Sequence, residues 1–423
     1  MNVFFRIHLL IALFFSIAAT CLAEDWPAFR GPRGDGHSKE NRVPVTWDRE
    51  TNVKWKVPLA LPANGSPIVS NGRVFLTMPE DREGRGRSLH CFDRRNGRQL
   101  WVRSVTIDRA MPTHGANPYG GSTPAADGRR VVVWHGSAGL VCYDFDGNEQ
   151  WRRDFGEFRH MWGYGTSPVL HGDRVILHTG PGERSFVAAL DLRDGTTIWK
   201  ADEPPAPEHA KKRLHGSWCT PLITSAADGR GQVICAHPLR VVAYDLEDGR
   251  EMWWCAGLAC ERGNLAYSSP IVANDVCIVR GGYEGPEIAI RLGGSGDVTK
   301  THRLWRHPEQ PSNVGSGVVV DAHLYMPDEN GHLACIEVAT GHRVWSAHPD
   351  KGKMWGSIIY AAGRLYALNQ RGTTVIFEPN PEQFTLVATN ALGEKTNATP
   401  AVSEGEIILR TFERLYCVSA RID

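Results

Sequence analysis

Aromatic, histidine and basic residues gather in several segments of the chain. Each segment lies just ahead of a hydroxyl residue that begins a short apolar stretch, as at Thr123-Pro124 and Thr220-Pro221. Trp and Tyr rings stack on planar or sugar-like ligands, and cationic side chains bind anionic groups. The candidate ligand-binding residues are His114, Tyr119, His160, Trp162, Tyr164, Arg213, His215, Trp218, Tyr267, Lys353 and Trp355. At equivalent positions the chain has Asn64, Lys212, Arg262, Asn264, Asn313, Lys395 and Asn397.

Carboxylates are almost absent from these segments, so the paired acids of glycoside hydrolysis are not indicated, and we assign no catalytic residue. A single histidine such as His160 or His215 is more typical of a hydrogen-bonded loop, and we assign no metal ligand. The chain also lacks a nucleophile elbow, a His-Glu-x-x-His helix and a Walker loop. The pattern favours recognition over catalysis. The alternative is that these aromatic side chains pack on their own hairpins.

An internal repeat positions these segments. Eight hydroxyl residues each begin an apolar stretch that is followed by a turn and a β-branched run: Ser66, Thr123, Ser167, Thr220, Ser269, Ser316, Ser357 and Thr399. The step from Thr220 to Ser269 is 49 residues and the next, to Ser316, is 47. Such steps fit one four-stranded blade of a β-propeller. The loops before the innermost strands of a propeller converge on one mouth of the channel, which makes that mouth the candidate site.

A second motif recurs between these starts. Asp93, Gly97 and Trp101 have counterparts with the same spacing at 191, 195 and 199, at 245, 249 and 253, and at 337, 341 and 345, where Glu replaces Asp. A shorter copy ends at Trp151, and weaker copies carry Trp55 and Trp305. Each Trp is expected on an outer strand, where its ring packs on a neighbouring blade and its N–H reaches a carbonyl. Each acid is expected to accept N–H bonds within the turn.

The last copy, residues 399–422, ends after its third strand. Residues 52–57 can supply the missing outer strand, which would close the ring and cover the sheet edge. The predicted fold is therefore all-β, a single eight-bladed β-propeller over residues 51–423 that is closed by pairing of N- and C-terminal strands. Residues 24–50 are predicted to form an N-terminal tail.

The Asp-x-x-x-Gly-x-x-x-Trp spacing resembles the repeat of pyrroloquinoline-quinone-like (PQQ-like) propellers of the quinoprotein alcohol dehydrogenase-like superfamily. The opening at residues 25–32, Asp-Trp-Pro-Ala-Phe-Arg-Gly-Pro, and the segments 290–299 and 409–417 resemble its exported bacterial, BamB-like branch. The resemblance covers essentially the whole mature chain and implies the propeller fold. It implies no single function, because the superfamily contains dehydrogenases and assembly scaffolds.

The cysteines follow the repeat. Cys91, Cys142, Cys335 and Cys417 occupy the third-strand position that Ala189, Ala243 and Ile376 occupy in other blades, so we expect small core residues there. Cys255 and Cys260 lie in one loop and are the one pair for which we consider a disulfide.

The first 23 residues resemble a secretory signal: Arg6 precedes an apolar run, Leu9 to Ala19, and Ala23 offers a cleavage site. We therefore expect export to the periplasm or the extracellular space. A membrane anchor and a lipid anchor at Cys21 are the alternatives. No later segment is apolar enough to span a membrane. Because 47 Lys and Arg balance 47 Asp and Glu, we expect no nucleic-acid partner.

The leading hypothesis is an exported, non-enzymatic binding or scaffold protein of the cell envelope, with an envelope protein or glycan as partner and no cofactor. The alternative implied by the resemblance is a PQQ-dependent dehydrogenase with calcium. Such enzymes typically carry adjacent cysteines and carboxylate ligands, whereas no two cysteines are adjacent here and the mouth segments offer few acids. A lyase or hydrolase that uses His and Tyr is a third hypothesis.

Overall fold

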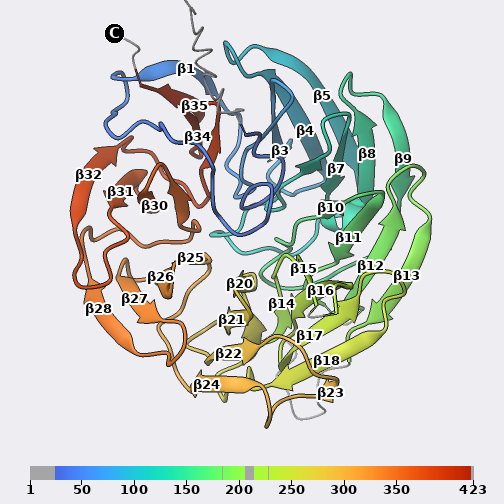
Figure 1. Cartoon of the computed structure of the whole chain (residues 1–423). Coiled ribbons are helices and arrows are strands. Elements are labelled where there is room, and N and C mark those ends of the chain that lie inside the picture. Colours follow the sequence, from blue (N-terminus) through green and yellow to red (C-terminus); the bar gives the residue numbers. More distant parts are fainter. Residues whose placement is uncertain (1–23, 183, 205–213, 227, 421–423) are drawn as a thin grey trace, which may run out of the picture.

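The computed structural model describes residues 24–182, 184–204, 214–226 and 228–420. Eight antiparallel sheets follow one another around a central channel, as Figure 1 shows. This confirms the predicted all-β, eight-bladed propeller. The predicted signal peptide, with Cys21, lies outside the described residues.

The strands of each blade run in chain order from the channel outward. Blades 1 to 3 are β2 (Ile68–Ser70), β3 (Arg73–Pro79), β4 (Gly86–Asp93) and β5 (Gln99–Thr106); β6 (Ala125–Ala126), β7 (Arg130–Trp134), β8 (Leu140–Asp144) and β9 (Glu149–Arg153); and β10 (Val169–His171), β11 (Arg174–His178), β12 (Phe186–Asp191) and β13 (Thr197–Asp202). Blades 4 and 5 are β15 (Leu222–Ser225), β16 (Gly231–Ala236), β17 (Arg240–Asp245) and β18 (Glu251–Ala256); and β20 (Ile271–Ala273), β21 (Val276–Arg280), β22 (Glu287–Arg291) and β24 (Arg303–His307). Blades 6 and 7 are β25 (Val318–Val320), β26 (His323–Pro327), β27 (Leu333–Glu337) and β28 (Arg343–Ala347); and β29 (Ile359–Ala361), β30 (Arg364–Leu368), β31 (Thr373–Phe377) and β32 (Leu386–Ala391).

Blade 8 joins the two ends of the ring. Its inner strands are β33 (Ala401–Ser403), β34 (Glu406–Arg410) and β35 (Arg414–Ser419), and its outer strand is β1 (Val53–Pro58). Trp55 of β1 pairs with Cys417 of β35, and Figure 1 shows the blue β1 beside the dark red β35. The predicted closure by residues 52–57 is therefore confirmed.

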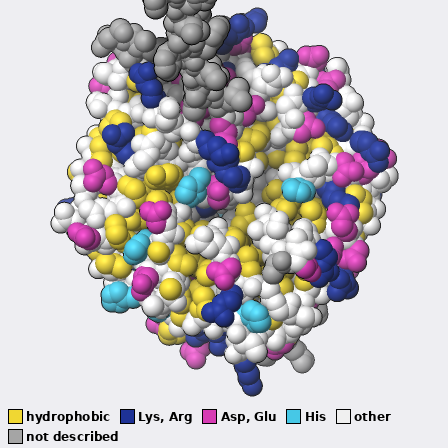
Figure 2. All heavy atoms as spheres, viewed as in Figure 1, with side chains coloured by type: hydrophobic (Ala, Val, Ile, Leu, Met, Phe, Trp, Pro, Cys, Tyr) yellow, Lys and Arg dark blue, Asp and Glu magenta, His cyan; other side chains and the backbone are white. Residues whose placement is uncertain are grey.

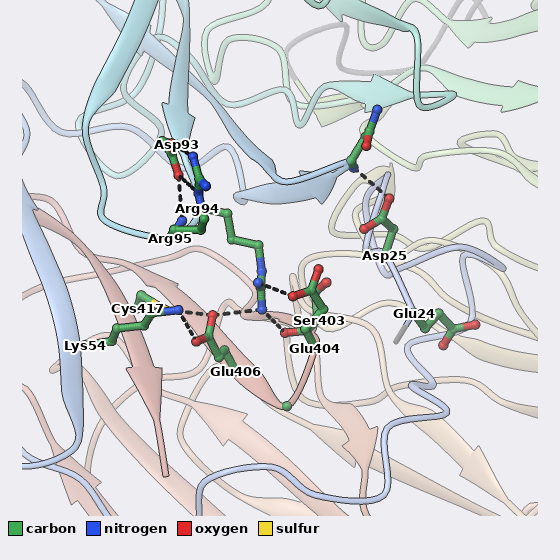
Figure 3. Close-up of polar contacts among 12 residues, drawn as sticks. Glu24, Asp25, Lys54, Asp93, Arg94, Arg95, Ser403, Glu404, Glu406 and Cys417 are labelled. Atoms are coloured by element: carbon green, nitrogen blue, oxygen red, sulfur yellow. Dashed lines mark hydrogen bonds and ion pairs between the residues drawn. The ribbon is translucent and has the colours of Figure 1, made fainter. Parts of the chain in front are cut away.

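A buried ion-pair network seals this junction (Figure 3). The Arg94 guanidinium, in the turn after β4 of blade 1, donates to the Ser403 carbonyl at 2.9 Å and pairs with Glu404 and with Glu406 at 2.8 Å. Lys54 of β1 reaches Glu406 from the other side at 2.6 Å. The Arg94 and Glu406 side chains are only 5% and 8% exposed, so the network lies inside the seam between blades 8 and 1.

The repeat tryptophans dock on the next blade, as predicted. The outer strand β9 buries one residue, Trp151, whose indole N–H donates to the Leu192 carbonyl of blade 3 at 3.0 Å. Trp55, Trp101, Trp199, Trp305 and Trp345 make the same kind of bond to the following blade. The turn glycine of that blade lies against the ring: a Cβ built on Gly195 would stand 2.6 Å from Trp151. At this position φ is +73°, so both the backbone conformation and the ring contact require glycine.

Trp253 departs from this pattern, because its N–H donates to the Gln232 side chain of its own blade at 3.0 Å. In the next blade, residues 292–302 replace the short acid-to-glycine turn, and β23 (Gly296–Asp297) pairs parallel to β18 as a fifth strand of blade 4. A second addition is the parallel pair of β14 (His215–Ser217) and β19 (Asn264–Ala266), which ties the loops ahead of blades 4 and 5 together. The sequence repeat predicted neither addition.

The cysteines and acids of the repeat have the predicted surroundings. Cys91, Cys142, Cys335 and Cys417 are fully buried, and burial raises the pKa of the Cys91 and Cys142 thiols to about 12. The Asp191 carboxylate accepts the backbone N–H of Arg193 at 2.7 Å. All nine cysteines in the described part of the chain are free thiols, including Cys255 and Cys260, so no disulfide joins that pair.

The N-terminal tail crosses the ring on the side opposite to the mouth loops. Trp26 pairs with Val69 of β2, and His37 pairs with Tyr360 of β29. Between them the buried guanidinium of Arg30 donates to the Gly317 carbonyl at 2.7 Å. Burial lowers the pKa of Arg30 to about 10. These partners all follow the starting hydroxyl residue of their blade, and Figure 1 shows the blue tail reaching into the middle of the ring.

Basic and acidic side chains are interspersed on the face shown in Figure 2, in keeping with their equal numbers. None of the described helical segments is long and apolar enough to cross a membrane.

Arg94→Met should destabilise the ring closure, because it leaves the buried Glu406 and the Ser403 carbonyl without their guanidinium partner. We expect a loss of about 2 kcal/mol in the free energy of unfolding, since Lys54 still faces Glu406. Arg95→Met is the matched control, because the Arg95 side chain is 82% exposed and its pair with Asp93 should contribute little. Urea denaturation measures both, and equal midpoints would contradict the role given to Arg94.

Candidate functional site

Hydroxyl groups from all eight blades form a closed ring of hydrogen bonds around the channel. The backbone N–H of each ring residue donates to the side-chain hydroxyl of the ring residue in the next blade, and the Thr399 N–H donates to Ser66 Oγ to complete the circle. The donor-to-acceptor distances lie between 2.9 and 3.2 Å. The members are the eight starting residues of the repeat: Ser66, Thr123, Ser167, Thr220, Ser269, Ser316, Ser357 and Thr399.

Each hydroxyl of this ring also has its own hydrogen to donate. Ser316 donates to the Ser269 carbonyl at 3.4 Å. The other ring hydroxyls have no protein acceptor within hydrogen-bond distance in the described part of the chain. The ring therefore offers several hydrogen-bond donors to a molecule in the channel.

A cavity of about 430 Å³ lies at the ring, and all eight ring residues line it. Phe29 of the N-terminal tail also lines it, from the side opposite to the mouth loops. Toward the mouth the lining residues are Asn64, His114, Asn117, Gly121, Trp162, Gly165, Trp218, Tyr267, Tyr283, Val314, Glu329, Trp355 and Asn397. The volume falls within the range of ordinary small-molecule sites.

Four aromatic side chains form one continuous cluster along this wall. The Trp162 ring lies 5.9 Å from Trp218 and 6.1 Å from Tyr267, and it stacks on Tyr283 at 6.2 Å. The Trp218 indole N–H donates to the Gly163 carbonyl at 3.0 Å, which fixes its ring on the neighbouring loop. Contacts of this kind hold the ring faces in place before a ligand arrives.

His160 lies behind this cluster and does not line the cavity. Its ring meets the Trp218 ring edge-on at 4.8 Å, and its Nδ1 accepts the Trp162 backbone N–H at 3.2 Å. Burial, with a smaller contribution from His215, lowers the pKa of His160 to about 4, so the ring is neutral near pH 7. Desolvation also lowers the pKa of His215, which lies in β14. The neutral His160 ring supports the aromatic wall and carries no charge into the cavity.

Tyr119 and Tyr164 also lie outside the lining. They sandwich the buried Arg87 guanidinium, whose carbon stands 5.3 Å from the Tyr119 ring centre and 4.9 Å from that of Tyr164. This cation–π stack joins blades 1 and 2 beneath the mouth loops. Arg87 lies in a strand, and its spacing from the two tyrosines gives no sign of this contact in the sequence.

Of the remaining candidate residues, some line the cavity and others do not. His114 and Trp355 line the cavity, and the Trp355 indole N–H is buried without an acceptor. Lys353 lies outside the lining, is 57% exposed and pairs with Glu329 at 3.2 Å. Arg213 is outside the described residues.

Three asparagine side chains fasten the mouth loops to one another. Asn397 donates to Asn64 Oδ1 at 3.0 Å, Asn64 donates to Asn117 Oδ1 at 3.1 Å, and Asn117 donates to the Trp162 carbonyl at 2.7 Å. This chain links the loops of blades 8, 1, 2 and 3. Asn64 and Asn397 were noted in the sequence, but Asn117 was not.

Sequence reasoning also missed Phe29, Tyr283 and Glu329 as lining residues. Phe29 belongs to the tail, Tyr283 to the loop between β21 and β22, and Glu329 to the loop between β26 and β27. None of the three lies directly ahead of an innermost strand, where the repeat places the mouth residues. The loops that join the second and third strands of a blade also reach the mouth. Including these loops among the mouth segments would have identified Tyr283 and Glu329.

Comparisons with known proteins agree with the fold. A family model described as outer membrane protein assembly factor BamB matches residues 85–347. Polyvinylalcohol dehydrogenase of Pseudomonas sp. is 21% identical over 274 residues, which are 56% of this chain but 42% of that relative, so the match spans less than half of the relative's length.

Two solved structures are similar over most of the chain. BamB from Moraxella catarrhalis is 14% identical with a TM-score of 0.60, over 87% of this chain and 97% of its own. Quinohemoprotein alcohol dehydrogenase from Comamonas testosteroni is 13% identical with a TM-score of 0.65, over 94% of this chain and 81% of its own. At these identities the likeness establishes the fold alone.

Thr220→Val should destabilise the hydroxyl ring, because it removes the acceptor of the buried Ser167 backbone N–H while keeping the side-chain shape. We expect a loss of about 1–3 kcal/mol in the free energy of unfolding. Thr220→Ser keeps the acceptor and should lose distinctly less. Chemical denaturation compares the two, and a serine variant as unstable as the valine variant would show that the hydroxyl is not what matters.

Proposed function

The chain belongs to the family described as outer membrane protein assembly factor BamB, and from that premise we propose that it is an exported, non-enzymatic binding protein of the cell envelope. Its ligand site is the aromatic cavity at the mouth of the channel. We further propose that the ligand is an uncharged, ring-shaped group, as in a glycan.

One observation carries this proposal: the cavity has aromatic walls, a ring of hydroxyl donors and very few ionisable groups. Among the described lining residues, the only carboxylate is Glu329, which Lys353 neutralises, and the only imidazole is that of His114. Sugar rings present one apolar face and a rim of hydroxyl groups. Trp162 and Trp355 suit the face and the hydroxyl ring suits the rim.

The same residues fit a quinone cofactor poorly. Pyrroloquinoline quinone carries carboxylate groups that need cationic partners, and no Lys or Arg lines the described part of the cavity. A calcium ion beside it would need several oxygen ligands with negative charge, and Glu329 is a single carboxylate already paired with Lys353. We therefore place the PQQ-dependent dehydrogenase second.

The described lining of the cavity also lacks the pair of carboxyl groups that glycan hydrolysis requires. Hydrolysis needs two carboxyl groups on either side of the scissile bond, and the described lining supplies one. A neutral site that binds without reacting is the function that these groups support best.

Trp162→Ala and Trp355→Ala should each weaken binding of a neutral oligosaccharide about tenfold, because each removes a stacking face. N-acetylglucosamine, glucose and mannose trisaccharides are the probes, with intrinsic fluorescence and calorimetry as readouts. Trp254→Phe is the matched control, because the half-buried Trp254 lies on outer strand β18 and not in the cavity.

Failure of all three probes to bind, or unchanged binding in both cavity variants, would contradict the proposed ligand class. Stoichiometric binding of pyrroloquinoline quinone with calcium, together with dye-linked alcohol oxidation, would overturn the non-enzymatic assignment.

A further inference from the structure

Five side chains with metal-binding atoms meet between blades 3 and 4, outside the cavity. His178 ends β11 and Glu203 directly follows β13, both in blade 3. His237 follows β16 of blade 4, where Cys235 also lies, and Cys219 precedes β15. The side chains of His178, Glu203 and His237 are 0%, 7% and 2% exposed. The repeat motif requires none of these five residues at its position.

Glu203 Oε2 lies between the two imidazole rings. It is 3.6 Å from His178 Nε2 and 3.3 Å from His237 Nδ1. Two nitrogen or oxygen ligands of one tetrahedral zinc ion, each about 2.0–2.1 Å from the metal, stand about 3.3–3.5 Å apart. Both distances from Glu203 Oε2 are close to this spacing, and all three atoms lie within 4.8 Å of one another.

The other nitrogen of each ring is held by a partner. His178 Nδ1 lies 3.1 Å from the Cys219 carbonyl oxygen, which can only accept, so Nδ1 carries the hydrogen and Nε2 is free to ligate. His237 Nε2 lies 2.9 Å from the Tyr244 hydroxyl. Ligating histidines in metal sites are oriented by such bonds at the second nitrogen.

The buried Glu203 carboxylate needs a positive charge beside it, which a bound metal ion or a protonated histidine supplies. Glu203 forms its ion pairs in the described part of the chain only with His178 and His237. Glu203 Oε2 and His237 Nδ1 are both buried without a hydrogen-bond partner of acceptable geometry. With neutral imidazoles, the buried carboxylate would lack a compensating charge, which is costly in a protein interior.

We propose that His178 Nε2, Glu203 Oε2 and His237 Nδ1 bind one zinc ion between blades 3 and 4. Imidazole and carboxylate are common zinc ligands, and three protein ligands leave a fourth position for a water molecule or for Ser185 Oγ, which lies 3.2 Å from His178 Nε2.

The cysteine pair offers a competing ligand set that shares His178. Cys219 Sγ lies 3.5 Å from Cys235 Sγ, and the two form a cluster with His178. Cys219 Sγ already accepts the Ala236 backbone N–H at 3.2 Å and lies 3.2 Å from the Ala236 carbonyl. These backbone contacts give the thiol a packing role, and His178 Nδ1 is engaged by the Cys219 carbonyl. The geometry therefore favours the nitrogen and oxygen set.

The ion would cross-link two blades close to the cavity wall. His178 bonds to the carbonyl of Cys219, which directly follows Trp218 in the chain, and Trp218 lines the cavity. Metal binding would thus fix the segment that carries one aromatic wall residue.

Metal analysis of the purified protein tests the proposal. We expect about one zinc per chain by mass spectrometry, and less than a tenth of that in Glu203→Gln and in His237→Gln. The matched control changes His332 and His348 to Gln. Their ring centroids lie 4.4 Å apart, and the His332 side chain is 42% exposed. The control variant should keep its zinc, because an exposed histidine pair would hold a metal ion only loosely.

Cobalt substitution distinguishes the two ligand sets. After chelation and cobalt loading, the proposed set gives visible d–d bands without a near-ultraviolet thiolate-to-cobalt band, and Cys219→Ser leaves the spectrum unchanged. A thiolate band, or zinc lost in Cys219→Ser and kept in Glu203→Gln, would overturn the proposal.

The wild-type chain provides a test that does not depend on the folding of any variant. Zinc added back to the chelated protein should raise its melting temperature, and magnesium should not. No zinc in the isolated protein together with no shift on its addition would overturn the proposal.

Discussion

A closed circle of eight hydrogen bonds around the channel holds the blades of this propeller together. The starting residue ahead of each inner strand donates its backbone N–H to the hydroxyl of the next blade. The circle is complete because the Thr399 N–H donates to Ser66 Oγ. A hydroxyl is suited to this position because it accepts that N–H and keeps a hydrogen of its own. Any other blade number would change the angle between neighbouring strands, so one set of hydrogen bonds fixes both the width of the channel and the polar lining of the cavity.

The repeat tryptophans connect neighbouring blades at the rim of the propeller, as the hydroxyl residues connect them around the channel. Trp151 lies on Gly195 and bonds to the Leu192 carbonyl, so a large ring and a residue without a side chain fit together across each blade boundary. Where the next blade lacks the turn, as beyond Trp253, the bond returns to Gln232 and β23 covers the edge instead. The seam between blades 8 and 1 adds the Arg94 network, and Lys54 of β1 joins it from blade 8, where strand pairing, and no chain connection, holds β1 to β35.

These two interactions explain why the fold could be predicted from the sequence. Both recur once per blade, so the positions of Ser269 and Trp253 each repeat a pattern seen elsewhere in the chain. The site was harder, because its residues obey no repeat. Trp162, Trp218, Tyr267, Trp355 and His114 were found from their place ahead of inner strands. Tyr119 and Tyr164 share that place, yet their rings enclose Arg87, a contact between blades that depends on side-chain direction. Phe29 reaches the cavity through a tail whose path no periodicity records.

The cluster of His178, Glu203 and His237 shows the same limit more sharply. The three residues are 25 and 34 positions apart and belong to different strands, so nothing in their spacing indicates a common site. They meet because His178 ends β11, Glu203 directly follows the outer strand β13 and His237 directly follows β16 of the next blade. All three strands end toward the same mouth. Regular blades bring their strand ends together at that mouth whatever residues stand there. The scaffold can therefore carry a binding cavity at its axis and a metal site between two blades without any change in the repeat that holds it closed.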